Sequence, residues 1–421
     1  MIQTMELFPG IILRCCRDTR FKQGCLSLQI VRPMDASENA MNALLPSVLV
    51  RGTNRHESLR AITQRLDELY GACVSAVVRR VGDYQTTGLY CSFMEDRFAL
   101  PGDRVLAPMA EFLGELLLDS PVEEGGFRRD FVEREKKNLI ATIESELNDK
   151  RAYAMNQMLK SMCREDCYGL PRLGEKEQVA AIDPVRLYEH YHSILRSSPI
   201  HLFYVGSRQA EEVAELIRPI FSEISREYVP ALPQTGFQGC EGGCISESME
   251  ISQGKLCMGF VTPITNRCKE YPAMQILNTI FGAGMTSKLF LNIRERMSLC
   301  YSIGSGYYGS KGIVTVSAGI DFDKEEVTRQ EVMRQLELCR SGEISDEELT
   351  AAREAILSSL RATHDSPGAI EGYYATTALS GLGMTPAEYM AAVEAVTKEQ
   401  VVAAANTVTL HTTYFLKGAC Q

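Results

Sequence analysis

The sequence contains no long run of apolar residues. None of its stretches approaches the roughly 20 residues that a membrane-spanning helix requires, so we expect no membrane span. The first ten residues lack a basic region followed by an apolar one, so we also expect no secretory signal peptide. Positive charge is scarce: 44 Lys and Arg stand against 54 Asp and Glu, which gives a net charge of −10. This acidity excludes a broad nucleic-acid-binding surface.

The cysteines follow no pattern that is typical of a metal site or a disulfide framework. The 14 cysteines are scattered, and many lie in apolar stretches. The pairs Cys163/Cys167 and Cys240/Cys244 are spaced more widely than zinc ribbons prefer and have no neighbouring histidine, so we expect no structural metal there. In a chain without a signal peptide, such cysteines indicate a reduced protein and predict a cytoplasmic location.

The composition is that of a folded globular protein. The chain has 421 residues, of which 45% are hydrophobic and 23% are charged, enough for a sizeable core and for about two to three domains. Residues 225–250 are rich in proline and glycine and have few apolar runs, which is typical of a linker. We therefore predict an N-terminal domain at 1–227, a linker at 228–248 and a C-terminal domain at 249–421.

The predicted elements occur in the same order in both halves. In the first half, periodicity predicts strands at 11–14, 25–31, 72–81, 86–92 and 200–205, and helices at 40–50, 56–69, 104–118, 123–162 and 211–221. In the second half it predicts helices at 273–281, 287–297, 324–341, 345–363 and 385–408, and strands at 299–306 and 312–320. Both halves therefore contain a helix, a glycine turn, a helix, two strands and a helix, in that order.

Residues also match between the halves. The segment 44–53 aligns with 277–286, and 65–73 aligns with 293–300 if a one-residue gap is allowed. An internal duplication joined by one linker predicts two similar α+β domains that face each other, each a sheet with helices packed on one face. The alternative at this level is coincidence between generic α+β elements.

The run FGAGMTSKLFLNIRERMSLCYSI at 281–303 resembles the C-terminal-domain signature of the M16 metallopeptidases, the family of pitrilysin, insulysin and the mitochondrial processing peptidase. The first half resembles the N-terminal domain of this family, so the resemblance spans nearly the whole chain. It implies two duplicated M16-type (LuxS/MPP-like) domains, arranged as a clam around a peptide-binding chamber.

Active members of this insulinase-like family carry an inverted zinc motif, H-x-x-E-H, shortly before a Gly-Thr. Two histidines at i and i+4 lie on one helix face and bind zinc, and the Glu activates the metal-bound water. Anchored on Gly52-Thr53, the histidine positions fall on Ala43 and Ser47, and the general-base position falls on Pro46. Ala has no donor atom, Ser is a poor zinc ligand and Pro cannot take a proton, so the zinc motif is lost.

The third zinc ligand of active members is a downstream Glu. It should lie within 135–144, and the favoured register places Thr142 at that position, with Glu144 close by. The histidines of the chain are His56, His190, His192, His201, His364 and His411. None forms an i, i+4 pair, and the densest cluster, at 189–192, is expected at a polar helix end with its two imidazoles about 200° apart. We therefore expect no metal, no cofactor and no intrinsic catalytic residue.

One functional feature that the resemblance implies remains. Arg294 and Tyr301 match a paired Arg and Tyr that the C-terminal domain of M16 enzymes presents to the substrate backbone. Arg supplies a forked cationic donor, and a Tyr hydroxyl can support a developing oxyanion. The alternative is structural: Arg294 pairs with a local carboxylate such as Glu295, and Tyr301 begins a strand. The family context favours substrate binding by both residues.

The resemblance implies a non-catalytic M16-like subunit that binds peptide and forms a heterodimer with a zinc-bearing M16 paralogue, giving a composite peptidase. The segments 148–154 and 166–169 resemble the inactive YfmF-like subunits of Gram-positive bacteria. Two alternatives stay open. One is an active zinc peptidase with non-standard ligands, and the other is a purely structural M16-like subunit. By itself the chain is not expected to be an enzyme.

Overall fold

The computed structural model describes residues 2–146, 148–232 and 234–418. The chain divides into two compact units, and each has its own sheet. The first unit consists of Met1–Glu144, Pro171–Pro233 and His364–Leu379, and the second of Ser145–Leu170, Gln234–Thr363 and Ser380–Gln421. Among the helices that can be described, none combines the length and the apolar character that a membrane crossing requires.

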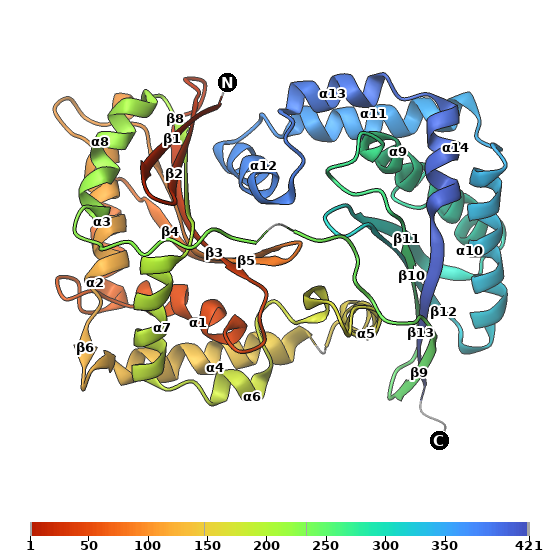
Figure 1. The fold of residues 1–421 in the computed structure, drawn as a ribbon, viewed down its shortest axis with the longest axis horizontal. Helices are drawn as coiled ribbons and strands as arrows, with labels where there is room; N and C mark the ends of the chain where they lie inside the picture. Colours follow the sequence, from red (N-terminus) through yellow and green to blue (C-terminus); the bar gives the residue numbers. More distant parts are fainter. Residues whose placement is uncertain (1, 147, 233, 419–421) are drawn as a thin grey trace. The chain divides into compact units, whose positions relative to one another are not determined.

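The first unit is built on a six-stranded mixed sheet in the order β1-β2-β8-β3-β5-β4 (Figure 1). Within the described strands of this sheet, β2 and β8 run parallel and all other neighbours run antiparallel. The strands are β1 (Ile2–Phe8), β2 (Ile11–Arg17), β3 (Gln23–Pro33), β4 (Cys73–Val81), β5 (Tyr84–Met94) and β8 (Ile200–Gly206).

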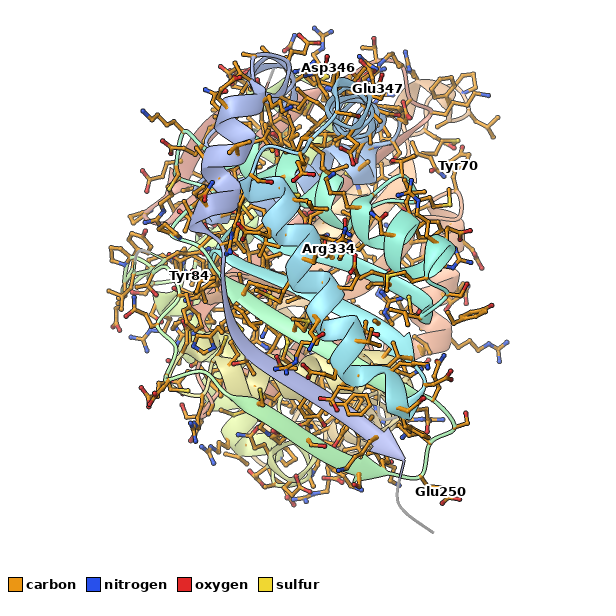
Figure 2. The ribbon with its side chains drawn as sticks, turned by 90° about the vertical axis from the view of Figure 1, so that its right-hand side faces the viewer. Tyr70, Tyr84, Glu250, Arg334, Asp346 and Glu347 are labelled. Carbon is orange, nitrogen blue, oxygen red and sulfur yellow. The ribbon has the colours of Figure 1, made fainter. Side chains whose placement is uncertain are left out.

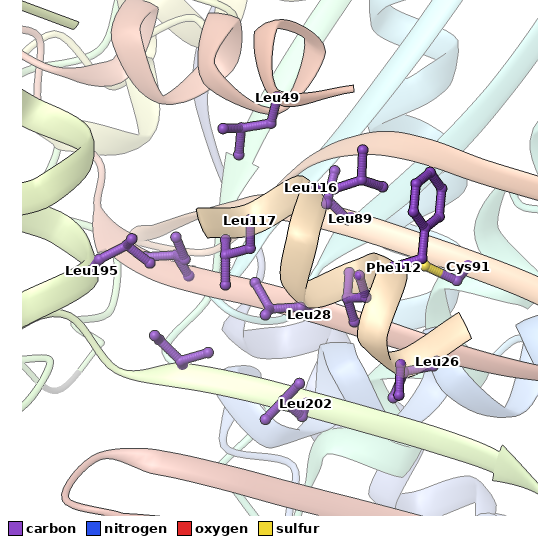
Figure 3. Packing of buried hydrophobic residues seen from close by; sticks show 14 of the residues in the cluster. Leu26, Leu28, Leu49, Leu89, Cys91, Phe112, Leu116, Leu117, Leu195 and Leu202 are labelled. Atoms are coloured by element: carbon purple, nitrogen blue, oxygen red, sulfur yellow. The ribbon is translucent and has the colours of Figure 1, made fainter. Parts of the chain in front are cut away.

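One face of this sheet carries the main hydrophobic core. Leu26 and Leu28 of β3 point to this face and pack with side chains such as Phe112 and Leu195 from the covering helices (Figure 3). Successive residues of a strand alternate between faces, and removing apolar surface from water drives this packing. The helices that the N-terminal half of the chain contributes to this unit are α1 (Asn39–Leu49), α2 (Leu59–Glu68), α3 (Leu106–Leu118), α4 (Arg129–Glu146), α6 (Lys176–Ala180), α7 (Pro184–Ser197) and α8 (Ala210–Phe221). The short elements are η1 (Asp96–Phe98), β6 (Val122–Glu123) and β7 (Gly126–Phe127).

The opposite face of this sheet is polar, and a helix from the second half of the chain covers part of it. This helix, α12 (Pro367–Ser380), buries Glu371 to 1% exposure. The carboxylate accepts hydrogen bonds from Ser27 (2.7 Å) and Gln29 (2.9 Å) of β3, and it pairs with Arg79 of β4 at 2.9 Å. A buried carboxylate requires this full set of partners, because an unpaired charge would be costly to bury.

The second unit is built on a five-stranded mixed sheet in the order β11-β12-β10-β13-β9. Its strands are β9 (Cys244–Met249), β10 (Gly254–Val261), β11 (Cys300–Tyr308), β12 (Ile313–Ile320) and β13 (Thr409–Gly418). Its helices are α5 (Lys150–Met162), α9 (Tyr271–Phe281), α10 (Glu325–Arg340), α11 (Asp346–Ala362), α13 (Pro386–Glu394) and α14 (Lys398–Thr407). Its short helical segments are η2 (Cys167–Gly169), η3 (Phe290–Arg296) and η4 (Phe322–Lys324). Figure 2 looks onto this unit, with Arg334 on α10 and Asp346 and Glu347 at the start of α11.

The two sheets repeat each other strand by strand. The first sheet, read from β4, runs β4-β5-β3-β8-β2, and the second, read from β11, runs β11-β12-β10-β13-β9. The strands at matching places follow the same order along the chain, and the parallel pair (β8 with β2, β13 with β9) falls at the same place in both. The predicted α+β fold of two duplicated domains is thereby confirmed, with β1 as an addition to the first sheet.

Each half of the chain contributes one helix to the unit that contains the sheet of the other half. These helices, α5 and α12, occupy the same place in the order of elements of their halves. In the second unit, α5 lies against the face of Gly259, where a Cβ would meet the sulfur atoms of Met158 and Met162. The other face of that sheet packs on α9, through Phe260 and Phe281 at 6.4 Å between ring centroids. The helices therefore lie on one face of each sheet, as predicted, and one further helix lies on the other face.

The segments 148–154 and 166–169 attach α5 to the second unit. Asp149 caps the helix by accepting hydrogen bonds from two backbone N–H groups of its first turn. Arg151 donates to the hydroxyl of Ser317 on β12 (2.9 Å). Asp166 pairs with Lys311 at 2.8 Å, and both side chains are almost completely buried. These segments therefore have a structural role in addition to their use as a family signature.

Several strands were not predicted from the sequence. They are the short strands β6 and β7, together with β1, β9, β10 and β13. The central strands β10 and β13 pair with segments far away in the chain, and local patterns do not show such partners. β9 begins at Cys244, inside the segment predicted as a linker. The predicted helix at 385–408 is two helices, α13 and α14, and the predicted helical stretch 123–162 contains the separate helices α4 and α5.

Candidate functional site

Helix α1 carries the positions at which the resemblance predicts the zinc motif. Ala43 is buried, Pro46 is buried inside the helix, and Ser47 is half-buried. Pro46 has no N–H to donate to the carbonyl of Asn42, one turn earlier. The hydroxyl of Thr87 on β5 donates to this carbonyl instead, at 2.6 Å. The helix therefore continues through the proline without a buried, unpaired carbonyl.

The position assigned to the third metal ligand lies on α4. Thr142 is exposed, and its hydroxyl donates to the carbonyl of Asn138 in the same helix (3.0 Å). The nearby carboxylate of Glu144 pairs with Lys176. A protein zinc site requires at least three N, O or S donors that converge on the ion, and α1 offers only the hydroxyl of Ser47 in place of two imidazoles. The residues present at these positions do not fit a zinc ion.

The histidines closest to this region have other partners. His190 Nε2 lies 2.7 Å from Asn42 Oδ1, and burial lowers the pKa of His190. His56 Nδ1 lies 2.7 Å from Glu115 Oε1. His190 and His192 lie in the middle of α7, so the prediction of a polar helix end was wrong. Leu187 and Tyr191 on the same helix are buried, so α7 has an apolar face. This face was not recognised in the sequence beside the histidine cluster.

Arg294 lies on the short segment η3, whose backbone is a π-helix. The N–H of Met297 donates to the carbonyl of Asn292 (3.0 Å), five residues earlier, which is the hydrogen bond of a π-helix. The guanidinium of Arg294 lies 3.4 Å from Glu295, and the Arg294 side chain is 37% exposed. An ion pair this exposed contributes little to stability, so the guanidinium can exchange this partner for a ligand.

Tyr301 lies at the start of β11, which is an edge strand of the second sheet. The pairing of β11 with β12 shifts between Cys300 and Ser302, so Tyr301 is the extra residue of a β-bulge. Bulges of this kind turn a side chain away from its regular direction. Tyr301 is 79% exposed. Within the described strands, β11 pairs only with β12, so its outer edge has no strand partner.

The turn between the two residues brings Arg294 to the beginning of β11. Ser298 has a φ of 51°, in the left-handed region that residues other than glycine seldom adopt. Burial raises the pKa of Cys300 to about 11, and the positive charge of Arg294 acts on this thiol in the opposite direction. Arg294 is therefore close to the residue that precedes Tyr301. Over the described residues, the side-chain contacts of Arg294 are with Glu295 and the ring of Phe290, and not with Tyr301.

Exposed apolar residues flank Arg294 in the chain, and the sequence analysis did not single them out. Met285, Leu291 and Met297 are 76%, 39% and 42% exposed. Large apolar residues such as Met and Leu are ordinarily buried in a core, so only their exposure distinguishes these three.

Comparison with known proteins identifies relatives over almost the whole chain. A family model described as "Peptidase M16 inactive domain" matches residues 181–356. The chain is 28% identical to the "Probable inactive metalloprotease YmfF" of Bacillus subtilis over 97% of this chain and 96% of that protein. It is 20% identical to the "Uncharacterized zinc protease YmxG" of the same bacterium over 78% of this chain and 75% of that protein.

Solved structures share the fold. A conserved protein from Enterococcus faecalis is 24% identical, with a TM-score of 0.91 over 100% of this chain and 99% of that one. A structure titled as the peptidase M16 inactive domain from Pseudomonas fluorescens is 17% identical, with a TM-score of 0.81 over 100% of this chain and 98% of that one. At these identities the likeness establishes the fold alone.

Two duplicated α+β units, with a first helix that lacks zinc ligands, define a metallopeptidase-like protein without the catalytic motif. The chain is similar to the M16 peptidase family, and both the family model and the relative that it matches over 97% of its length are described as inactive. The resemblance stated from the residues is thereby confirmed. The relative described as inactive is named YmfF, so the name YfmF given to this subgroup in the sequence analysis was wrong.

Proposed function

We propose that this chain is a non-catalytic M16-like subunit that binds peptide and pairs with a zinc-bearing M16 paralogue to form a composite peptidase. The observation that carries the proposal is the pair of accessible donors at the start of an edge strand. Tyr301 is 79% exposed in a bulge, and the ion-pair partner of the Arg294 guanidinium, Glu295, is itself exposed to solvent.

An edge strand supports binding of an extended peptide. The outer edge of β11 presents backbone N–H and C=O groups, which a substrate strand can pair with by β-augmentation. In this arrangement a Tyr hydroxyl and an Arg fork next to the strand can hold a peptide carbonyl. The exposed residues Met285, Leu291 and Met297 offer apolar contacts for the side chains of the same peptide.

The composition of α1 supports the proposal of a partner. Ala43 and Pro46 supply neither a ligand nor a base, so hydrolysis requires a zinc site from another chain. Relatives whose names describe zinc proteases occur at 20% identity over most of the chain. Such a relative, encoded in the same genome, is the partner that we propose, with the metal on one subunit and Arg294 and Tyr301 on the other.

The central test is peptide cleavage by the purified partner mixed with variants of this chain. Arg294→Ala and Tyr301→Phe should each lower the activity of the mixed complex by about 10²-fold, the usual effect of losing one oxyanion-type donor. Arg296→Ala is a matched control, because Arg296 lies on the same segment and is exposed. Full activity with both variants would show that Arg294 and Tyr301 have structural roles only.

Pairing and metal content separate this proposal from its alternatives. We expect the two chains to elute together in gel filtration, with about one zinc per heterodimer and none on this chain alone. A tightly bound zinc on the isolated chain, with cleavage of peptides, would favour a peptidase with non-standard ligands. A stable complex that cleaves no peptide would favour a purely structural subunit.

A further inference from the structure

A cavity of about 450 Å³ in the first unit is lined by four arginines. The charged residues around it are Arg17, Arg97, Arg104, Arg208, Asp96 and Glu212. The chain as a whole is acidic, with 44 basic and 54 acidic residues. The four guanidinium groups give the lining of this cavity the opposite sign of charge. Such a concentration of positive charge attracts an anionic ligand.

The fold gathers these arginines at one edge of the first sheet. β2 and β8 run parallel and end together in register, with Arg17 as the last residue of β2. β5 ends at the same edge, because Cys25 of β3 pairs with both Val205 of β8 and Ser92 of β5. The segment η1 follows β5 and contributes Arg97. The loops that follow the carboxyl ends of parallel strands commonly form ligand sites.

The two carboxylates of the cavity are already occupied. Asp96 accepts hydrogen bonds from the N–H groups of Val105 (2.7 Å) and Leu106 (3.0 Å), and it pairs with Arg208 at 2.7 Å. Glu212 accepts from a backbone N–H at the start of α8 (3.0 Å) and lies 3.5 Å from Arg208. Arg208 is therefore the ion-pair partner of both carboxylates. The positive charges of the other three arginines are not neutralised by these two carboxylates.

The other three arginines are held by backbone carbonyls. Arg17 donates to the carbonyl of Ser207 (3.1 Å), Arg97 donates to two carbonyls that include that of Phe21 (3.0 Å), and Arg104 donates to the carbonyl of the preceding residue (3.2 Å). Across the described residues, none of these three has a carboxylate within ion-pair distance. A neutral carbonyl fixes one edge of a guanidinium and leaves its charge and its remaining N–H groups available to a ligand.

We propose that this cavity binds the phosphate group of a small phosphorylated ligand. A carboxylate has two coplanar oxygens and is satisfied by a single guanidinium fork, whereas a phosphate dianion has three oxygens that donors can approach from several directions. Three uncompensated arginines around one cavity suit the second geometry. The volume of about 450 Å³ lies within the range of small-ligand sites. This site is independent of the proposed peptide-binding residues.

The proposal is tested by calorimetric titration of the full chain with inorganic pyrophosphate, at low ionic strength and in a buffer without phosphate. We expect saturable binding at ligand concentrations below about 1 mM. The double variant Arg17→Gln/Arg104→Gln should bind at least tenfold more weakly. Both side chains are exposed and bond only to carbonyls, so the variant should melt at the temperature of the unaltered chain.

A second basic cavity supplies the matched control. Arg60 and Arg134 line it together with several carboxylates, so Arg60→Gln/Arg134→Gln should leave pyrophosphate affinity within about twofold of the unaltered chain. Equal loss in both double variants would show that binding is non-specific and would overturn the proposal. Absence of binding to the unaltered chain, or full binding to Arg17→Gln/Arg104→Gln, would also overturn it. Citrate that binds as tightly as pyrophosphate would overturn the assignment to phosphate.

Discussion

At the scale of single residues, His201 and Arg14 lie in an unusual environment. They lie on the adjacent parallel strands β8 and β2. His201 Nδ1 and Arg14 Nη1 are both buried and have no hydrogen-bond partner among the described residues. Burial, and secondarily the charge of Arg14, lowers the pKa of His201 to about 3. The folded protein therefore holds this imidazole in its neutral form at every pH at which the chain is expected to work.

This pKa predicts a specific loss of stability in acid. The folded-state pKa of His201 lies below the ordinary value. The stability that the neutral imidazole contributes to the folded state is therefore fully present above pH 6.5 and is lost as the pH falls towards 3. Between pH 6.5 and pH 4.5 the loss should be about 2 kcal/mol. Urea denaturation should therefore show a shallower dependence on pH for His201→Gln than for the unaltered chain. His364→Gln is the control, and equal slopes for all three proteins would contradict the prediction.

At the scale of elements, α1 shows how a helix can continue through an interior proline. Pro46 lies inside α1 at the position that the resemblance assigns to the general base, and it removes the donor to the Asn42 carbonyl. Thr87 replaces this donor from the neighbouring strand β5. The sequence shows the proline but not its compensation, because Thr87 lies 41 residues after Pro46 in the chain and meets α1 only in the folded unit.

This compensation can be measured with a double-mutant cycle. Thr87→Val should lower the free energy of unfolding by about 1–3 kcal/mol, because it leaves a buried carbonyl without a donor. In the Pro46→Ala background the same substitution should cost much less, because the N–H of residue 46 then donates to that carbonyl. The four proteins are compared by urea denaturation. An equal cost of Thr87→Val in both backgrounds would show that Thr87 does not substitute for the missing N–H.

The segment from η3 to β11 shows the limit of sequence reasoning at this scale. The spacing of Arg294 and Tyr301, together with the family resemblance, was enough to single them out. Neither the π-helix under Arg294 nor the bulge at Tyr301 has a signal in the sequence. Both depend on how the segment is held between α9, α10 and the edge of the second sheet, because tertiary packing selects a strained backbone that local propensity does not favour.

At the scale of the whole molecule, the duplicated halves do not coincide with the compact units. α5 belongs to the unit that holds the second sheet, and α12 belongs to the unit that holds the first. We propose that the boundaries 1–227 and 249–421 describe the duplicated halves of the sequence, and that neither half is an independently folding domain. Without α12, for example, Arg79 and Ser27 would lose their bonds to Glu371.

Separate expression of the two halves tests this proposal. The fragment 1–227 lacks α12, and the fragment 249–421 lacks α5 and nearly all of β9 and so exposes apolar residues such as Cys257 and Tyr414. Each fragment alone should aggregate or bind a hydrophobic dye, whereas the two together should form a one-to-one complex. The matched control is the full chain cut at a protease site inserted at 236–243, which should remain associated. A monomeric fragment with a cooperative thermal transition would contradict the prediction.

The sequence by itself determined the fold class, the duplication, the family and the loss of the zinc motif. These properties are carried by periodicity, by internal similarity and by residue types at fixed spacing, all of which are local. The tertiary structure alone decided that α5 and α12 each belong to the unit that holds the sheet of the other half, and that Glu371 is buried against Arg79. It also decided that a bulge exposes Tyr301 and that four arginines line one cavity. Each of these joins segments that are distant in the chain, so its energy depends on packing and desolvation between partners that no local pattern identifies.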